Sequence, residues 1–171
     1  MTRFNLRNPR TLAITAVMTA ITFVMTRLVQ IPTPARGFIH LGDAAVLFAA
    51  FAFGPWVGMV AGGLGTTLVD LTSGFAQWAP FTLVIHGLEG YLAGRIAAGD
   101  IKIGRLVLAA CAGGLVLVPG YFIAGVILAG LGGATGEVLG NVFQILGGAI
   151  LSIPLYLAVR RAYPRLGEMT T

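Results

Sequence analysis

The run from Leu106 to Gly130, LVLAACAGGLVLVPGYFIAGVILAG, indicates whether this chain folds in water or in a lipid bilayer. It contains no Asp, Glu, Lys, Arg or His, and it exceeds the roughly 20 apolar residues that a helix needs to cross a bilayer. The whole chain has 171 residues, and only 10% of them are charged, whereas a soluble domain carries about 25%. The composition therefore predicts an integral membrane protein.

Six apolar runs predict an all-α fold, a bundle of six transmembrane helices that forms a single domain over residues 1–171. The predicted spans cover approximately residues 11–30, 42–54, 55–71, 80–97, 106–130 and 137–159. A loop with two prolines, Ile31 to Leu41, separates the first two spans. The glycine-rich stretch Leu131 to Gly136 is expected to form the turn before the last span.

The basic residues are distributed asymmetrically about this bundle. Nine of the 11 fall on one side of the membrane: Arg3, Arg7, Arg10, Arg95, Lys102, Arg105, Arg160, Arg161 and Arg165. Short loops rich in Lys and Arg stay in the cytoplasm, so both termini are expected there. The net charge of +5 is therefore attributed to orientation in the bilayer and not to binding of nucleic acid.

Strongly polar side chains within the apolar runs lie toward the opposite side of the membrane. They are Asp43, Asp70, His86, Glu89, Glu137, Asn141 and Gln144. Because a charge in hydrocarbon costs several kcal/mol unless it is paired or faces a cavity, such residues often mark a ligand or ion pathway. The spacing i, i+4, i+7 places Thr82, His86 and Glu89 on one helix face, and Glu137, Asn141 and Gln144 are spaced in the same way.

These two stripes predict a shared pocket that opens to the outside. The candidate substrate-binding residues are Asp43, Asp70, Trp78, Thr82, His86, Glu89, Asn141 and Gln144. Simpler roles remain open for several of them. Asp43 and Asp70 lie near helix ends, His86 can pair with Glu89 within the same helix, and Trp78 can belong to the interfacial aromatic belt.

No catalytic motif accompanies the polar stripes. The sequence lacks Gly-x-Ser-x-Gly, His-Glu-x-x-His and a phosphate-binding glycine loop, so we expect neither an enzyme nor ATP hydrolysis by this chain. No Cys or His cluster has the spacing of a metal site, and no metal and no cofactor are expected. An acidic, aromatic pocket suits a flat nitrogen heterocycle, such as a pyrimidine or pyridine vitamin or riboflavin.

Several motifs occur in a characteristic order. They are FIHLGDA (38–44), FGP (53–55), GGLG (62–65), LVDLTSG (68–74) and WAPFTLVIHGLEG (78–90). Together they resemble the S components of energy-coupling factor (ECF) vitamin transporters, within the branch related to riboflavin and hydroxymethylpyrimidine transporters. His86 and Glu89 depart from this pattern, because many relatives have lysine at the first position and an apolar residue at the second.

The resemblance implies a substrate-capture subunit in a prokaryotic cell membrane. Such a subunit binds a water-soluble vitamin or precursor, for example hydroxymethylpyrimidine, pyridoxine or riboflavin, and releases it inside. Its implied partners are a membrane coupling (T) subunit and two cytoplasmic ATPases. Ala16 and Ala20 match the Ala-x-x-x-Ala motif with which the first helix contacts the T subunit, and the loop Ile31 to Leu41 corresponds to a lid over the pocket.

Two other classes of protein are compatible with the same residues. One is a secondary transporter that acts alone and is driven by protons through Glu89 and His86. The other is a structural membrane protein without a small ligand, in which the polar stripes only hold the helices together. Ligand binding and transport by the isolated chain distinguish these alternatives.

Overall fold

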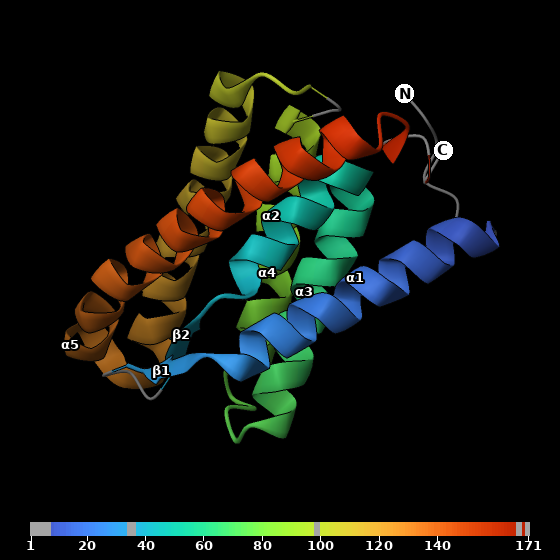
Figure 1. Cartoon of the computed structure of the whole chain (residues 1–171). Coiled ribbons are helices and arrows are strands. Elements are labelled where there is room, and N and C mark those ends of the chain that lie inside the picture. Colours follow the sequence, from blue (N-terminus) through green and yellow to red (C-terminus); the bar gives the residue numbers. More distant parts are fainter. Residues whose placement is uncertain (1–7, 34–36, 98–99, 167–168, 170–171) are drawn as a thin grey trace.

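The computed structural model describes residues 8–33, 37–97, 100–166 and 169, and it is mostly helical (Figure 1). The elements are α1 (Pro9–Leu28), β1 (Gln30–Pro32), β2 (Phe38–His40), α2 (Gly42–Phe53), α3 (Pro55–Thr72), α4 (Ala79–Ala97) and α5 (Ile103–Ala162). The most extensive helix contact is that between α3 and α4. The hairpin, the α3–α4 loop and the bend of α5 lie at the lower end of the view in Figure 1, here called the hairpin end. The α4–α5 connection and the end of α5 lie at the opposite end.

Helix α1 begins at Pro9, whose missing N–H suits a first helical turn, and the Asn8 side chain accepts a hydrogen bond from the Arg10 backbone N–H. Its buried face consists of Met18 and four threonines: Thr11, Thr15, Thr22 and Thr26. Ala16 and Ala20 lie on the other face and are exposed. These two small residues therefore do not form the contact between α1 and the rest of the bundle.

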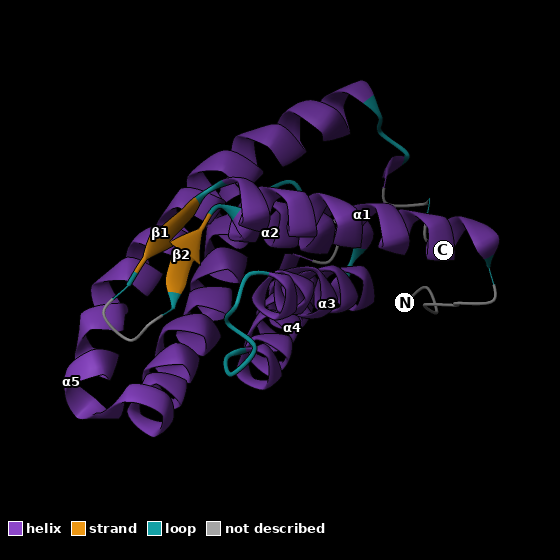
Figure 2. Cartoon of the chain, turned by 90° about the horizontal axis from the view of Figure 1, so that it is seen from below, coloured by secondary structure: helices purple, strands orange, loops and turns teal. Residues whose placement is uncertain are grey.

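The chain between α1 and α2 differs from the predicted irregular loop. It contains a two-stranded antiparallel hairpin, in which Gln30 pairs with His40 and Pro32 pairs with Phe38 (Figure 2). The prediction of a loop without strands is wrong in this stretch, although the fold is mostly helical as expected. Because His40 is buried, its backbone groups need hydrogen-bonding partners, and strand pairing supplies part of them.

Glycines allow α3 and α4 to approach closely. A Cβ atom at Gly62 would lie 2.6 Å from the carbonyl oxygen of His86, and one at Gly58 would lie 2.7 Å from that of Gly90. Real Cβ atoms do not come so near to backbone atoms, so only glycine fits these positions. Small residues serve the same purpose in membrane helix pairs generally.

The last helix is interrupted once, at Gly130. This residue has φ 74° and ψ 176°, a backbone conformation that favours glycine, and helix α5 bends sharply there (Figure 1). The predicted turn over Leu131 to Gly136 is therefore wrong in its position, since these residues are helical. One glycine reverses the chain direction, and the following residues resume the helical hydrogen bonding.

Two of the described helices, α1 and α5, are each long and apolar enough to cross a membrane, and α2 is a shorter apolar helix.

The end of the bundle away from the hairpin, here called the apolar end, is filled by a cluster of apolar side chains. Its central members are Leu47, Phe51, Ala93, Leu106 and Tyr156. The buried polar side chains of α2 and α4 precede this cluster along each helix, and therefore lie on the side of the hairpin.

Candidate functional site

A cavity lies beneath the hairpin and encloses about 310 Å³ of empty space, part of it open to solvent. Its lining residues come from strand β2 and the residue before it, from helices α3, α4 and α5 and from the α3–α4 loop: Gly37, Phe38, His40, Asp70, Trp78, Thr82, Tyr121, Glu137 and Asn141. The wall thus combines aromatic rings with carboxyl, amide and hydroxyl groups, the kinds of groups that orient a small polar ligand.

The hairpin closes against aromatic residues of the bundle. The Phe38 ring packs against Phe75 of the α3–α4 loop, with centroids 4.8 Å apart. A Cβ atom at Gly37 would lie 3.4 Å from the Trp78 ring. Trp78 itself is buried and lies 5.9 Å from the Tyr121 ring, so the indole is part of the cavity wall and is not exposed at an interface.

Four of the eight predicted binding residues line this cavity: Asp70, Trp78, Thr82 and Asn141. The other four, Asp43, His86, Glu89 and Gln144, are also buried but lie deeper, behind His40. The sequence analysis places these eight residues in one site, whereas the structure arranges them in two layers. Both polar stripes do point inward, since every member of each stripe is at most 5% exposed.

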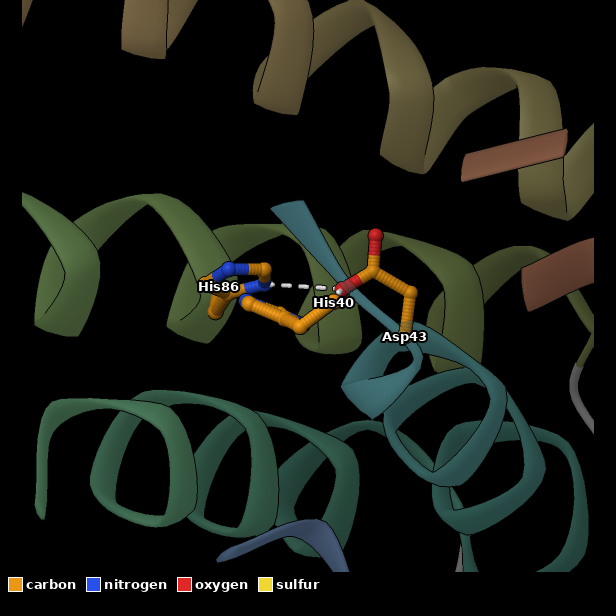
Figure 3. Close-up of side chains that lie close together, drawn as sticks. All are labelled: His40, Asp43 and His86. Atoms are coloured by element: carbon orange, nitrogen blue, oxygen red, sulfur yellow. Dashed lines mark ion pairs between the residues drawn. The ribbon is translucent and has the colours of Figure 1, made fainter. Parts of the chain in front are cut away.

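The deeper layer is centred on His86. Its Nδ1 atom shares a hydrogen bond of 2.7 Å with Oε2 of Glu89 and lies 3.5 Å from Oδ1 of Asp43. The His40 ring stacks nearby, with its centroid 5.3 Å from that of His86, and Figure 3 shows His40, Asp43 and His86 gathered around one point. The predicted pairing of His86 with Glu89 is confirmed by this geometry.

Gln144 ties the two layers and three elements together. Its Oε1 accepts a hydrogen bond of 2.9 Å from the backbone N–H of His40, at the end of β2. Its Nε2 donates to both carboxylate oxygens of Asp43, at 3.3 and 3.2 Å. The second half of α5 therefore holds the hairpin and the start of α2 in place through one side chain.

His40 is a site residue that our sequence reasoning missed. The backbone N–H of Gly42 donates to its Nδ1, so the ring is neutral and the Asp43 oxygen at 3.9 Å is not an ion-pair partner. Burial, together with the neighbouring His86, holds the pKa of His40 well below its usual value of 6.5. The motif FIHLGDA contained the signal, because His40 stands three residues before Asp43, a predicted site residue.

Tyr121 was also missed, and its hydroxyl starts a short relay. Tyr121 donates a hydrogen bond of 3.0 Å to Oγ1 of Thr82, and Thr82 is in turn hydrogen-bonded to Asp70. A tyrosine within the otherwise uncharged run Leu106 to Gly130 was the available signal. Glu137 lines the cavity as well, and it lies in the part of α5 that directly follows the bend.

Three of these side chains have the ligand types of a metal site. One ligand atom each of His40, Asp43 and His86 lies within 4.8 Å of the others. Nδ1 of His40 already accepts from Gly42, however, and Nδ1 of His86 is bonded to Glu89. Coordination through either atom would replace these hydrogen bonds, so the arrangement as it stands is a hydrogen-bonded cluster.

Comparison with known proteins agrees with the resemblance in the sequence. Residues 7–161 match the family model of the ECF-type riboflavin transporter, S component. A relative from Lactococcus lactis, the thiamine precursor transporter HmpT, is 36% identical over 157 residues, which are 91% of this chain and 90% of the relative. An uncharacterised protein from Pyrococcus woesei is 41% identical over 145 residues, covering 84% of this chain and 97% of the relative.

Two solved structures share the fold at 20% sequence identity. One is ThiT from Listeria monocytogenes, with a TM-score of 0.69 over 95% of this chain and 98% of the other. The second is the S component for biotin from an ECF-type ABC transporter, with a TM-score of 0.68 over 99% of both chains. Such a family consists of membrane-embedded substrate-binding components of transporters and not of enzymes. The chain therefore belongs to the S components of the ECF-type riboflavin transporter family.

Proposed function

We propose that this chain captures a water-soluble vitamin or vitamin precursor from outside the cell, with hydroxymethylpyrimidine as the first candidate. The cavity beneath the hairpin is the observation that carries the proposal. Its wall combines the Trp78 indole with polar atoms of Asp70, Thr82 and Asn141, which suits a flat heterocycle with hydrogen-bonding groups. The relative HmpT is named a thiamine precursor transporter, which supports the same class of ligand.

The binding role of each residue follows from its place in the two layers. Trp78 offers a ring face for stacking, and Asp70, Thr82 and Asn141 offer polar atoms at the cavity wall. Oδ2 of Asp70 and Nδ2 of Asn141 are buried and have no hydrogen-bonding partner within the described part of the chain. Buried polar atoms are normally paired, so a bound ligand is a natural partner for these two. Asp43, His86, Glu89 and Gln144 then position His40 and the hairpin.

We further propose six membrane segments with both termini in the cytoplasm. The bend at Gly130 divides α5 into two segments, which with α1 to α4 gives six. The hairpin end then faces outward, and the basic residues at the α4–α5 connection and at the end of α5 face inward. Of the basic residues on which this topology rests, Arg3 and Arg7 lie outside the described residues.

A thermal-shift screen tests the capture function. The purified chain in detergent is heated with hydroxymethylpyrimidine, pyridoxine, thiamine, riboflavin or biotin, each at several concentrations. A ligand at 100 times its Kd stabilises the folded state by about 2.7 kcal/mol, so a true substrate raises the melting temperature clearly. Absence of a shift with every compound, in protein whose unfolding is cooperative, would contradict the proposal.

The exposed face of α1 supports a contact with partner subunits. We infer that α1 docks on a membrane coupling subunit through Ala16 and Ala20, and that two ATPase subunits supply the energy. The exposure of both alanines supports this, because they are not used for packing within the chain. Replacing both by Trp is expected to abolish complex assembly and uptake while ligand binding persists. Ile150→Trp, at an exposed position of α5, is the matched control.

Transport by the isolated chain separates this proposal from a proton-driven transporter. The buried group of Asp43, His86 and Glu89 is the feature that favours the alternative. Reconstituted alone in liposomes with a proton gradient, the chain is expected to bind substrate without accumulating it. Accumulation that depends on the gradient and is lost in Glu89→Gln would support the alternative function instead.

A further inference from the structure

Four side chains with the ligand types of a transition-metal site meet in the deeper layer of the site. They are His40 at the end of β2, Asp43 at the start of α2, and His86 and Glu89 of α4. Three of them have no exposed surface, and His40 is 7% exposed, on the side of the cavity. Imidazole nitrogens and carboxylate oxygens together are typical ligands of zinc and of neighbouring divalent metals. The chemistry of this group therefore fits such an ion.

The atoms of this group are spaced much as the ligands of one ion are spaced. Around an ion with bonds of about 2.0–2.2 Å, ligand atoms lie about 3–4 Å from one another. Oδ1 of Asp43 lies 3.5 Å from Nδ1 of His86 and 3.9 Å from Nδ1 of His40. Figure 3 shows how these three side chains converge from β2, α2 and α4. Small shifts of the side chains would therefore place them around one ion.

Glu89 adds a second carboxylate and an oxygen that lacks a partner. Its Oε2 lies 2.7 Å from Nδ1 of His86, so the carboxylate faces the same point. Its Oε1 is buried and has no hydrogen-bonding partner within the described part of the chain. Buried polar atoms are normally paired, and a charged carboxylate within a membrane protein is costly unless it is compensated. A divalent cation would give Oε1 a partner and would balance the charges of Asp43 and Glu89.

The surroundings of the group hold both carboxylates in place. Gln144 donates from Nε2 to both oxygens of Asp43, which is the kind of outer contact that orients a metal ligand. Helix α5 leaves room for both side chains by means of glycines. A Cβ atom at Gly113 would lie 3.0 Å from Cγ of Glu89, and a Cβ atom at Gly148 would lie 2.8 Å from Cβ of Asp43. The two acidic side chains are therefore fixed in direction.

We propose that these four side chains form a binding site for one divalent transition-metal ion, with Zn²⁺ as the best fit, behind the cavity. The ion takes the place of the hydrogen between Nδ1 of His86 and Oε2 of Glu89, and Nδ1 of His40 exchanges the Gly42 N–H for it. Two neutral imidazoles, two carboxylates and a dication carry no net charge, which suits the interior of a membrane protein. Because its ligands come from β2, α2 and α4, the bound ion links the hairpin to the bundle.

Titration of the purified chain with Co²⁺, a coloured substitute for Zn²⁺, tests the site. The purification tag is removed and the protein is treated with EDTA, because a histidine tag or carried-over metal would hide the signal. The wild-type chain is expected to bind about one Co²⁺, seen by its visible absorption, and to exchange it for Zn²⁺. Zn²⁺ is also expected to raise the melting temperature by several degrees, because an ion that binds only the folded chain stabilises it.

Two substitutions that keep side-chain shape test the ligands. Glu89→Gln and Asp43→Asn each retain one oxygen that accepts a hydrogen bond but lose the negative charge. Each is expected to weaken Co²⁺ binding by at least about 100-fold, since even the loss of an outer contact costs about 10–100-fold in metal affinity.

Asp100→Asn is the matched control, since this carboxylate lies in the α4–α5 connection and pairs with Arg105. It is expected to bind Co²⁺ as the wild type does. Absence of Co²⁺ binding by the wild type would overturn the site, and so would binding that persists in both Glu89→Gln and Asp43→Asn. A melting temperature that stays constant or falls with Zn²⁺ would also overturn it. None of these measurements uses a vitamin, so their outcome is independent of the capture function.

Discussion

The two ends of the bundle are built from the same helices but with opposite chemistry. Helix α4 carries Thr82, His86 and Glu89 toward the hairpin, and farther along the helix its buried residues include Ala93 and Ala97. Helix α2 changes from Asp43 to Leu47 and Phe51 in the same way. The apolar end is filled by packed apolar side chains, whereas the cavity wall at the hairpin end includes the unpartnered polar atoms Oδ2 of Asp70 and Nδ2 of Asn141. Stability is therefore expected to depend on the first end, and ligand binding on the second.

The largest effect is expected from overpacking the apolar end. A Cβ atom at Gly94 would lie 2.6 Å from both N and Cα of Pro55, which are backbone atoms at the start of α3 and cannot rotate away. Gly94→Leu is expected to destabilise the fold by about 3 kcal/mol or more, because overpacking a tight contact costs roughly 1–3 kcal/mol even for small insertions. The melting temperature in detergent measures this loss.

Gly147→Leu provides the control for that substitution. A Cβ atom at Gly147 meets nothing within 4 Å, although this glycine, like Gly94, lies within a helix. The melting temperature is expected to stay the same or to rise, since leucine has the higher helix propensity by somewhat less than about 1 kcal/mol. Similar losses for both variants would show that glycine itself, and not close packing at the apolar end, is required.

The next largest effect is a loss of ligand affinity, which is expected to differ between substitutions in the two layers of the site. Trp78 lines the cavity, and Trp78→Ala is expected to weaken ligand binding about 30-fold, which corresponds to about 2 kcal/mol of lost stacking and buried area. Glu89 lies behind the cavity and contacts His86. Glu89→Gln keeps an oxygen that accepts from Nδ1 of His86, so a change of less than about 5-fold is expected. Titration calorimetry with the ligand found in the thermal screen measures both.

A larger effect for Glu89→Gln than for Trp78→Ala would reverse the order of the layers. It would mean that Glu89 itself contacts the ligand when the hairpin opens. A circular dichroism spectrum and a melting curve for each variant confirm that the comparison concerns binding and not folding.

Sequence periodicity predicted the helical segments and the inward direction of both polar stripes, because an apolar face and a polar face repeat with the helix. It could not predict the division of the site into two layers. The arrangement of the layers depends on long-range contacts such as those of Gln144, which links residues 101 and 104 positions away, and no local pattern reports such contacts. The bend at Gly130 was misplaced for a related reason. Several glycines occur between Gly130 and Gly136, and only tertiary packing determines which of them adopts the positive φ.

A smaller effect is expected when the hairpin is no longer hydrogen-bonded to the deeper layer of the site. Gln144→Leu removes the hydrogen bonds to the His40 N–H and to Asp43, each worth about 0.5–1.5 kcal/mol or more where a charged group takes part. The ligand is expected to dissociate about 10-fold faster, because the hairpin covers the cavity and is held there less firmly. Stopped-flow measurement with a competing ligand gives the dissociation rate. Gln77→Leu, an exposed change in the α3–α4 loop, is expected to leave this rate unchanged.

The smallest effect concerns pH and the hairpin residue His40, which lies between the membrane segments. Its pKa is lowered in the folded chain, so the unfolded chain binds more protons once the pH falls below about 6.5. The wild type is therefore expected to lose stability relative to His40→Asn between pH 7.5 and 5, by at most about 1.4 kcal/mol per pH unit. The asparagine oxygen can still accept from the Gly42 N–H, which keeps the hairpin geometry comparable. Melting temperatures of both proteins across this range measure the difference. A gap that stays constant with pH would mean that His40 takes up protons equally in the folded and unfolded chain, and it would contradict the lowering of its pKa by burial.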